Sequence, residues 1–282
     1  LVWSFFLSAA IMLLIYAFFG VYPFGKSSVL VLDLNGQYVQ FFAGFRQILY
    51  GDGSLLYSFS RSLGGEFMGI YAYYLASPLS YLVALFPADS ILEALLCILV
   101  LKTGLSGLFF GTYLHYTRRP HKAVTVSLSV LYALSSYSVV MQHNLMWMDG
   151  VMLLPLLILG LHRLIRQKKP ILYIVSLALV LLSNYYIGYM ICLFTAIWFF
   201  YDFVAHPETE TNPTGERRHF LSTLGRCALF TLIGVGLAAI LLLPAYYSLT
   251  FGKGAFSSPD FTFKAKFDIL DFLAKLFPGA YD

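Results

Sequence analysis

The chain has 282 residues, of which 59% are hydrophobic and 11% are charged, and its formal net charge is +4. Soluble domains are roughly 45 to 50% apolar and about 25% charged, so the expected solvent for most of this chain is lipid. The scattered basic residues argue against a nucleic-acid-binding surface, and three cysteines within apolar runs argue against a disulfide framework or a thiol metal site.

Apolar runs recur along the chain at the length that a helix needs to cross roughly 30 Å of hydrocarbon. Lipid offers no partner to an exposed backbone N–H, so each crossing segment must be helical. Seven spans can be drawn, over residues 1–22, 90–114, 123–141, 151–165, 170–184, 187–204 and 224–246. We therefore expect an all-α polytopic transmembrane helix bundle, with one transmembrane domain over residues 1–282. We also expect the chain to be part of a longer protein, because it starts without Met in an apolar run and stops at Asp282 just after a Pro-Gly turn.

The basic residues of the short loops orient these spans. Lys and Arg are enriched in short cytoplasmic loops, and this rule is satisfied if the first span runs from inside to outside. The short external loops 142–150 and 185–186 then carry no basic residue, and 205–222 becomes a solvated cytoplasmic loop. The opposite orientation would place ten basic residues outside: Arg118, Arg119, Lys122, Arg163, Arg166, Lys168, Lys169, Arg217, Arg218 and Arg226.

Residues 23–89 then form one long external loop, in which we expect amphipathic juxtamembrane helices. An apolar stripe at helical spacing lies opposite a polar one, which is typical of a helix lying flat on the membrane. The apolar stripe is Tyr38, Phe41, Phe42, Phe45, Ile48 and Leu49, and the polar one is Gln37, Gln40, Gly44 and Gln47. The segment 67–86 is apolar enough to be an eighth span, but a crossing there would reverse every later loop. Its four tyrosines and its proline favour a helix at the headgroup level.

Asp33 places a carboxylate just outside the first span, at the head of the amphipathic stretch. An aspartate there is an ordinary N-cap, because it satisfies unpaired N–H groups and favours the helix dipole. The same carboxylate is also placed to accept a proton from a hydroxyl group as a general base, although capping lowers its basicity. The residues alone leave both readings open.

Asp149 lies in the second external loop, in the run His143-Asn144-Leu-Met-Trp147-Met-Asp149-Gly150. A charge this close to hydrocarbon is costly, which favours a functional role, and the alternative is a cap for the helix from residue 151. Carboxylates on two external loops could converge on one site, either holding a divalent cation or dividing base and orienting roles. His143 has no second His or Cys at ligand spacing, so we interpret it as a polar loop residue.

Lys102 lies well inside the second span, where an unpaired ammonium would be expensive. It therefore needs a partner. A functional partner would be a lipid phosphate or an inward-facing carboxylate. The alternative is that the side chain snorkels to the membrane interface or forms an ion pair with a structural role only. Gly107 and Gly111 form a GxxxG motif, which permits close helix approach inside the bundle. Asn184 and Tyr185 close a very short external turn, where aromatic rings could stack on a sugar or form an aromatic belt.

A series of motifs carries a resemblance to a known family. In chain order they are Asp33-Leu-Asn-Gly-Gln-Tyr-Val-Gln-Phe, Ser62-Leu-Gly-Gly-Glu-Phe, Tyr71-Ala-Tyr-Tyr-Leu-Ala-Ser-Pro-Leu, Leu101-Lys102-Thr-Gly-Leu-Ser-Gly, Trp147-Met-Asp-Gly, Ser183-Asn-Tyr-Tyr-Ile-Gly-Tyr-Met and Leu276-Phe-Pro-Gly-Ala-Tyr-Asp. On these motifs, essentially the whole chain resembles the N-terminal part of the YfhO family of bacterial membrane proteins. Members of that family are considerably longer, with more spans and an external domain.

The resemblance implies a GT-C type glycosyltransferase of the bacterial cell membrane with an external active site. Such an enzyme takes a sugar from a polyprenyl-phosphate carrier and passes it to a cell-surface polymer, which for YfhO-like proteins is lipoteichoic acid. In that plan Asp33 matches the catalytic acidic residue, and Asp149 matches the acidic residue of the second external loop. Candidate substrate-binding residues are Gln37, Gln40, Lys102, His143, Asn144, Asn184 and Tyr185, with Arg46 and Arg61 as further candidates for the departing phosphate.

Cofactors and rival functions remain open on the sequence. The first external segment has no paired DxD or ExD motif, so an obligatory metal gains no support, and a divalent cation stays an alternative. The rival class is a transporter or flippase of a lipid-linked sugar, which should show repeat symmetry, broken helices and polar residues at the bilayer midplane. We find no clear repeat, and apart from Lys102 the polar residues cluster at the external edge. These charges also disfavour a purely structural scaffold.

Overall fold

A computed structural model describes residues 1–60, 63–205 and 216–251 of the chain. Within these residues it is almost entirely helical, which confirms the all-α class. The helices are α1 (Val2–Phe18), η1 (Leu34–Tyr38), α2 (Val39–Leu49), α3 (Met68–Ile70), η2 (Tyr71–Leu75), η3 (Pro78–Leu85), α4 (Ile91–Thr117), α5 (Lys122–Ala133), α6 (Ser136–Met141), α7 (Leu145–Gln167), α8 (Ile171–Ser183), α9 (Tyr185–Ala205) and α10 (Glu216–Phe251). Two short antiparallel strands, β1 (Tyr57–Ser58) and β2 (Gly65–Glu66), complete the described elements.

Four of the described helices, α4, α7, α9 and α10, are long and apolar enough to cross a membrane. The helices α1, α5 and α8 are apolar but shorter, and η2 with η3 forms an apolar pair bent by 99°. The continuous span predicted over 123–141 is wrong, because the chain breaks between α5 and α6. Ser135 adopts an extended conformation there and its hydroxyl accepts a hydrogen bond from the N–H of Ser138, which starts a new helix.

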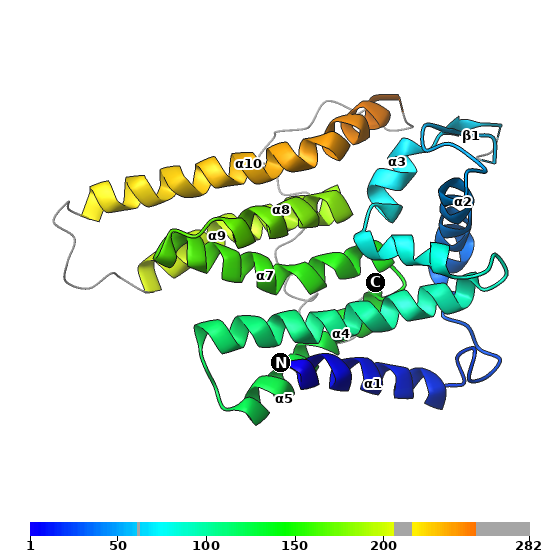
Figure 1. Ribbon diagram of the computed structural model, residues 1–282, viewed down its shortest axis with the longest axis horizontal. Helices are drawn as coiled ribbons and strands as arrows, with labels where there is room; N and C mark the ends of the chain where they lie inside the picture. The colour runs from blue at the N-terminus through cyan, green and yellow to red at the C-terminus, as the bar shows by residue number, and fades with distance from the viewer. Residues whose placement is uncertain (61–62, 206–215, 252–282) are drawn as a thin grey trace, which may run out of the picture. The chain divides into compact units, whose positions relative to one another are not determined.

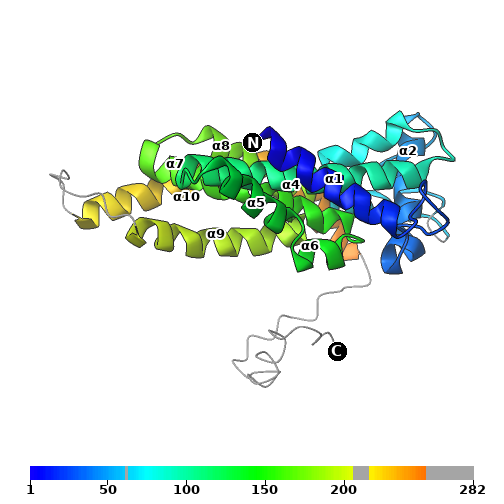
Figure 2. The ribbon, with the colours of Figure 1, turned by 90° about the horizontal axis from the view of Figure 1, so that it is seen from below.

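The helix α4 lies at the centre of the arrangement, with α1, α5 and α7 packed against it, and α7 in turn packs against α8 and α9 (Figures 1 and 2). Residues Leu1–Ser248 form one compact unit, and the second unit, Leu249–Asp282, lies almost wholly outside the described residues. The loop predicted over 205–222 is also largely outside them.

Small residues of α4 allow α1 to approach closely. A Cβ added at Gly107 would overlap the Ser8 side chain and the Ser4 carbonyl, and one at Gly111 would lie 2.8 Å from the Ser4 hydroxyl. Ser4 and Ser8 are fully buried in this contact. The prediction that the GxxxG motif works inside the bundle is therefore confirmed.

The segment 67–86 is not the single interfacial helix that we predicted. Ser77 is extended, because the ring of Pro78 disfavours the helical conformation at the preceding residue, and the chain therefore bends between η2 and η3. The pair packs into the protein, with η2 against α7, α8 and α9 and η3 against α2 and α4. Its bend gives it the geometry of a broken span or a re-entrant loop.

The predicted amphipathic helix is present as η1 and α2, but its apolar face is covered by protein. Phe42 and Phe45 are buried in a cluster with Leu75 and Val83 of the bent pair and with residues of α4. The opposite face, with Gln40 and Gln47, is exposed. The helix is thus a packed part of the fold, and protein covers most of its apolar stripe, although Leu49 at its end is 37% exposed.

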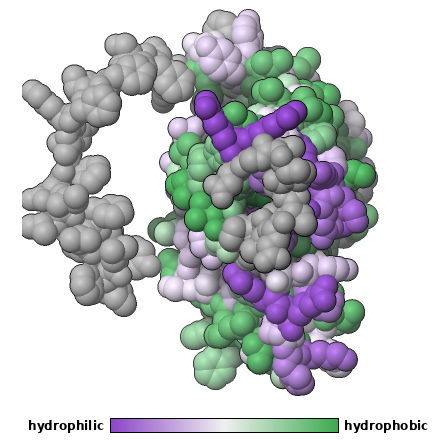
Figure 3. Space-filling view, turned by 90° about the vertical axis from the view of Figure 1, so that its left-hand side faces the viewer, coloured by the Kyte–Doolittle hydropathy of each residue, from purple (hydrophilic) through white to green (hydrophobic). Residues whose placement is uncertain are grey.

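The ends of the long helices carry the basic residues. The chain leaves α4 at Arg118, leaves α7 at Lys168 and enters α10 through Arg217. Figure 3 looks onto this end of the molecule, where hydrophilic residues gather. These Lys and Arg residues are the ones from which the sequence predicts that this end of the helices faces the cytoplasm.

We predict that Gly107→Leu separates α1 from α4 and destabilises the protein by about 1 to 3 kcal/mol, the usual penalty of overpacking. The measurement is thermal unfolding of the purified protein in detergent. Gly236→Leu is the matched control, because a Cβ at Gly236 meets no atom within 4 Å. Equal melting temperatures for the two variants would contradict the packing described.

Candidate functional site

A buried ion pair joins α4 to α7. The ammonium of Lys102 lies 2.7 Å from Oδ2 of Asp149, and these side chains are only 2% and 1% exposed. The same ammonium donates to the carbonyl of Leu145 at 2.7 Å, and the hydroxyl of Ser77 donates to Oδ1 of Asp149 at 2.8 Å. Both carboxylate oxygens are therefore engaged, and the bend between η2 and η3 is tied to both helices.

This geometry decides between the partners that the sequence left open for Lys102. The partner is an inward-facing carboxylate, and a lipid phosphate would have to displace Asp149 from a fully enclosed position. A buried ammonium without such a partner would be strongly disfavoured.

The predicted setting of Asp149 is wrong. It does not lie in a turn before a helix from residue 151, because α7 starts at Leu145 and Asp149 is already inside the helix. It cannot cap a helix from 151 for the same reason. The helix begins earlier than its hydropathy suggests because Lys102 offsets the buried charge.

Asp33 has the opposite environment and is exposed just before η1. The structure gives its side chain no capping hydrogen bond, so the N-cap interpretation is wrong. The carboxylate instead accepts from the hydroxyl of Tyr38, with 3.2 Å between Tyr38 Oη and Asp33 Oδ2. An exposed carboxylate held by one neutral donor can still accept a proton from a bound hydroxyl group.

Tyr38 connects Asp33 to the start of α7. Its hydroxyl also lies 3.1 Å from Oδ1 of Asn144, so its single proton is shared between Asp33 and Asn144 as two acceptors. Nδ2 of Asn144 lies 3.0 Å from Nε2 of His143. His143 Nδ1 faces the carbonyl of Val140 at 3.1 Å, which requires the proton on Nδ1 and leaves Nε2 as the acceptor. Burial raises the pKa of Tyr38, and the charge of Asp33 raises it further, so the phenol stays protonated at neutral pH.

The two carboxylates are connected through the start of α7, but their environments differ. Asn144 directly precedes Leu145, whose carbonyl is held by Lys102, so the buried pair fixes the position of the residue that meets Tyr38. The hydrogen bonds do not join Asp33 to Asp149 directly. Of the two carboxylates, Asp33 is exposed and Asp149 is enclosed.

Asn184 and Tyr185 belong to a neighbouring part of the fold. Asn184 is extended, ends α8 and caps α9 by accepting from the N–H of Ile187 at 2.8 Å. Its amide donates to the carbonyl of Tyr73 at 2.8 Å, and it is 1% exposed, so it holds the turn against η2. The ring of Tyr185 packs on Tyr73 at 5.6 Å between centroids.

A row of aromatic rings connects this turn to Tyr38. The Tyr73 and Tyr74 centroids are 4.6 Å apart, and those of Tyr74 and Tyr38 are 5.0 Å apart. Sequence reasoning did not identify Tyr38, Tyr74 or Ser77 as site residues. The sequence places Tyr38 in the apolar stripe of the amphipathic helix. The hydrogen bonds of its hydroxyl with Asp33 and Asn144 can be seen only in the three-dimensional structure.

The remaining candidate binding residues, Gln37, Gln40, Arg46 and Arg61, do not share one environment. Gln37 and Gln40 are exposed, and Gln40 lines a cleft of ≈ 540 Å³ along α2. Arg46 donates to the carbonyl of Phe86 at 2.7 Å and lies over the Tyr50 ring, so it has a structural role. Arg61 lies outside the described residues. Within the described ranges, no group of three or more His, Cys, Asp or Glu side chains is placed to hold a metal ion.

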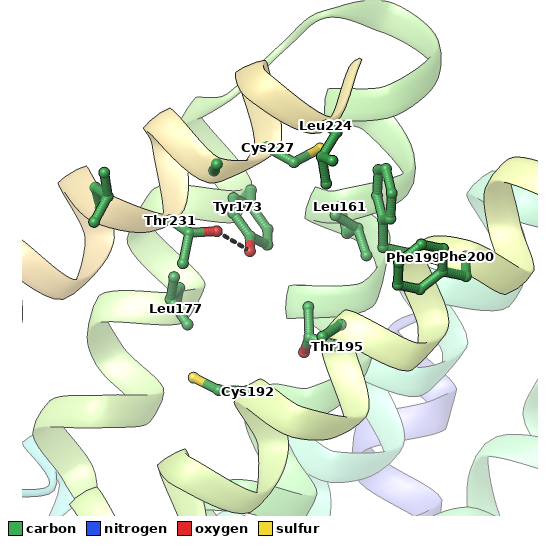
Figure 4. Close-up of a pocket in the computed structure, with 13 residues that line it drawn as sticks. Leu161, Tyr173, Leu177, Cys192, Thr195, Phe199, Phe200, Leu224, Cys227 and Thr231 are labelled. Atoms are coloured by element: carbon green, nitrogen blue, oxygen red, sulfur yellow. Dashed lines mark hydrogen bonds between the residues drawn. The ribbon is translucent and has the colours of Figure 1, made fainter. Parts of the chain in front are cut away.

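An apolar pocket of ≈ 390 Å³ lies among α7, α8, α9 and α10 (Figure 4). Leu161, Leu177, Phe199 and Leu224 contribute to its lining. The hydroxyls of Tyr173 and Thr231, drawn with a dashed line in Figure 4, form a hydrogen bond of 2.7 Å in its wall. The pocket suits a hydrocarbon chain far better than a sugar.

Comparisons with known proteins converge on one family. The family model described as "Bacterial membrane protein YfhO" matches residues 4–282. A protein of Bacillus subtilis (strain 168) described as "Uncharacterized protein YfhO" is 26% identical over 223 residues, which is 72% of this chain and 25% of that relative. This chain thus spans about a quarter of the length of the curated relative. No solved structure matches the chain.

We predict that Lys102→Met destabilises the protein by about 3 to 5 kcal/mol, because it leaves a buried carboxylate without its cation. The double variant Lys102→Met with Asp149→Leu should recover most of that loss, since no charge then remains enclosed. The measurement is denaturant unfolding of the single and double variants in detergent. Additive losses in the double variant would show that the two side chains do not interact.

Proposed function

The chain belongs to the YfhO family of bacterial membrane proteins, and we propose that it is the N-terminal part of a membrane glycosyltransferase. In this proposal the protein moves a sugar from a polyprenyl-phosphate carrier to a cell-surface acceptor such as lipoteichoic acid, on the outer face of the membrane. The observation that carries the proposal is the exposed carboxylate of Asp33, held by Tyr38 at the end of a hydrogen-bonded chain that includes Asn144 and His143.

The proposed reaction is a displacement at the anomeric carbon of the sugar. Asp33 accepts the proton of the acceptor hydroxyl, and the acceptor oxygen forms a bond to the anomeric carbon. The bond from that carbon to the carrier phosphate breaks, and polyprenyl phosphate leaves with the bonding electrons. Tyr38 contacts Oδ2 of Asp33, so Oδ1 is the oxygen on which the proposal places the acceptor.

Asp149 and Lys102 act as positioning residues in this proposal. Their burial separates them from any substrate, and their contact with Leu145 fixes the start of α7. Asn144 then lies where its side chain meets Tyr38. A displaced Asn144 would free Tyr38 to rotate away and would leave Asp33 without its fixed donor.

The apolar pocket supplies a place for the lipid part of the donor. A polyprenyl chain is a long hydrocarbon, and the pocket walls are mostly aliphatic and aromatic side chains of α7, α8, α9 and α10. Three of these helices, α7, α9 and α10, are long and apolar enough to cross a membrane. Burial of such a chain is favourable in proportion to the apolar area removed from water. Lys102 and Arg46 both have structural partners, so the proposal does not place the carrier phosphate on either of them.

A transporter or flippase of a lipid-linked sugar is the second candidate. Two observations favour it, namely the bend of 99° between η2 and η3 and the buried Lys102–Asp149 pair. Against it, each oxygen of the pair's carboxylate already has a partner, and the polar network ends at an exposed carboxylate instead of crossing the bundle. A proteoliposome assay that measures lipid flipping and sugar transfer separately distinguishes the two functions.

We predict that Asp33→Asn lowers sugar transfer by about 10² to 10⁴-fold, the range that a general base contributes. Tyr38→Phe should cause a smaller loss, because it removes the orienting donor and keeps the base. The assay follows a labelled sugar from polyprenyl phosphate to the acceptor, with the full-length protein in membranes. Asp89→Asn is the control, since Asp89 is another exposed carboxylate of the predicted external loop. Normal transfer by Asp33→Asn would remove the assigned role.

We also predict that Ala228→Trp, which fills the apolar pocket from α10, raises the KM for the lipid donor several-fold and leaves the KM for the acceptor unchanged. The neighbouring Leu229→Trp is the control, because Leu229 is 54% exposed and does not line the pocket. The same assay measures both constants. Identical donor KM values for the two variants would argue that the lipid binds elsewhere.

A further inference from the structure

The cleft along α2 is a second candidate binding site, separate from the carboxylate of Asp33. It has a volume of ≈ 540 Å³ and lies between α2, α3 and the segment around β1. Gln40, Gly44 and Gln47 of α2 form one wall. The segment that forms the other wall carries Tyr57 and Phe59, whose rings are in contact with centroids 5.1 Å apart.

Asp33 precedes the wall formed by α2 along the chain. Gln40, Gly44 and Gln47 are separated by four and three residues, the spacing that places side chains on one face of α2. The π-helical turn η1 separates Asp33 from the start of α2 at Val39, so Gln40 is the residue of this wall that is closest to Asp33 along the chain. A chain-like ligand lying in the cleft would therefore point one end toward Asp33.

The side chains in the cleft are suited to hydroxyl groups. Each glutamine amide offers two N–H donors and a carbonyl acceptor, a combination that matches a polyhydroxylated ligand. The aromatic rings add flat apolar faces, and they are not needed for the core, because Tyr57 is 46% and Phe59 is 83% exposed. Because these two exposed rings are in contact, they form one apolar face at the side of the cleft.

The charge of the cleft narrows the class of ligand. Asp52 is the one charged side chain among the described residues that line it, and no described Lys or Arg is there. A phosphate bound close to Asp52 would be repelled by its carboxylate. The lining therefore favours a neutral ligand over a phosphorylated one.

We propose that this cleft binds a neutral, polyhydroxylated part of the acceptor and aligns it along α2 toward Asp33. The proposal rests on the proposed glycosyltransferase function. It adds that the acceptor is recognised through hydroxyl groups and sugar or polyol faces, at a distance from the reacting carbon. Gln40 and Gln47 are the specificity-determining polar residues, and Tyr57 and Phe59 supply the stacking faces.

Gly44 provides the sharpest test of this cleft. A Cβ added at Gly44 meets no atom within 4 Å, so a larger side chain enters the open space of the cleft without a clash. Gly44→Leu should raise the acceptor KM at least tenfold while kcat and the donor KM stay within twofold of the wild type. Gly236→Leu, which has equally open surroundings on α10, is the control. An unchanged acceptor KM in Gly44→Leu would overturn the proposal.

A binding measurement keeps this test independent of transfer. The full-length wild type and Gly44→Leu are titrated with a soluble neutral gluco-oligosaccharide and with a polyglycerol phosphate of similar length. Binding of the neutral probe that weakens at least tenfold in Gly44→Leu supports the cleft, even if the wild type transfers no sugar and the proposed function fails. Tighter binding of the polyglycerol phosphate, or no Gly44-dependent binding of either probe, would contradict the proposal for the cleft. The proposed glycosyltransferase function would then still be tested by the transfer assay alone.

Discussion

The ion pair between Lys102 and Asp149 constrains how α4, α7 and the bent pair η2 and η3 pack together. Neither charge is stable alone inside an apolar bundle, and removal of either partner leaves the other enclosed. Buried pairs are weak evidence for added stability, because desolvation offsets most of their attraction, but they demand one geometry. Here that geometry includes the carbonyl of Leu145 and the hydroxyl of Ser77, so α4, α7 and the bent pair are held in one arrangement.

The position of Tyr38 beside the exposed Asp33 follows from the buried ion pair. With the start of α7 fixed, Asn144 meets Tyr38, and Tyr38 meets Asp33. The aromatic row from Tyr38 to Tyr73 ties the same tyrosine to the turn between α8 and α9. Two acidic residues that look equivalent in the sequence thus have different environments, since Asp149 is enclosed and Asp33 is exposed, and the proposed positioning and reacting roles follow this difference.

Much of this could be predicted from the sequence. Hydropathy alone identifies α4, α7 and α9, and the periodicity of the glutamines and phenylalanines identifies α2. The expense of a lone ammonium in an apolar run indicates that Lys102 has a partner. What could not be predicted depends on contacts between distant residues. The start of α7 looks like a loop until Lys102 offsets Asp149, and the cleft forms only when the segment around β1 folds back on α2.

The most direct test is an experimental structure of the full-length protein with an unreactive analogue of a polyprenyl-phosphate sugar. The account predicts that the sugar lies beside the carboxylate of Asp33, that the hydrocarbon chain occupies the pocket between α7 and α10, and that Lys102 still contacts Asp149. A carrier phosphate bound to Lys102, with Asp149 displaced from the ammonium, would contradict the division between a positioning pair and a reacting carboxylate.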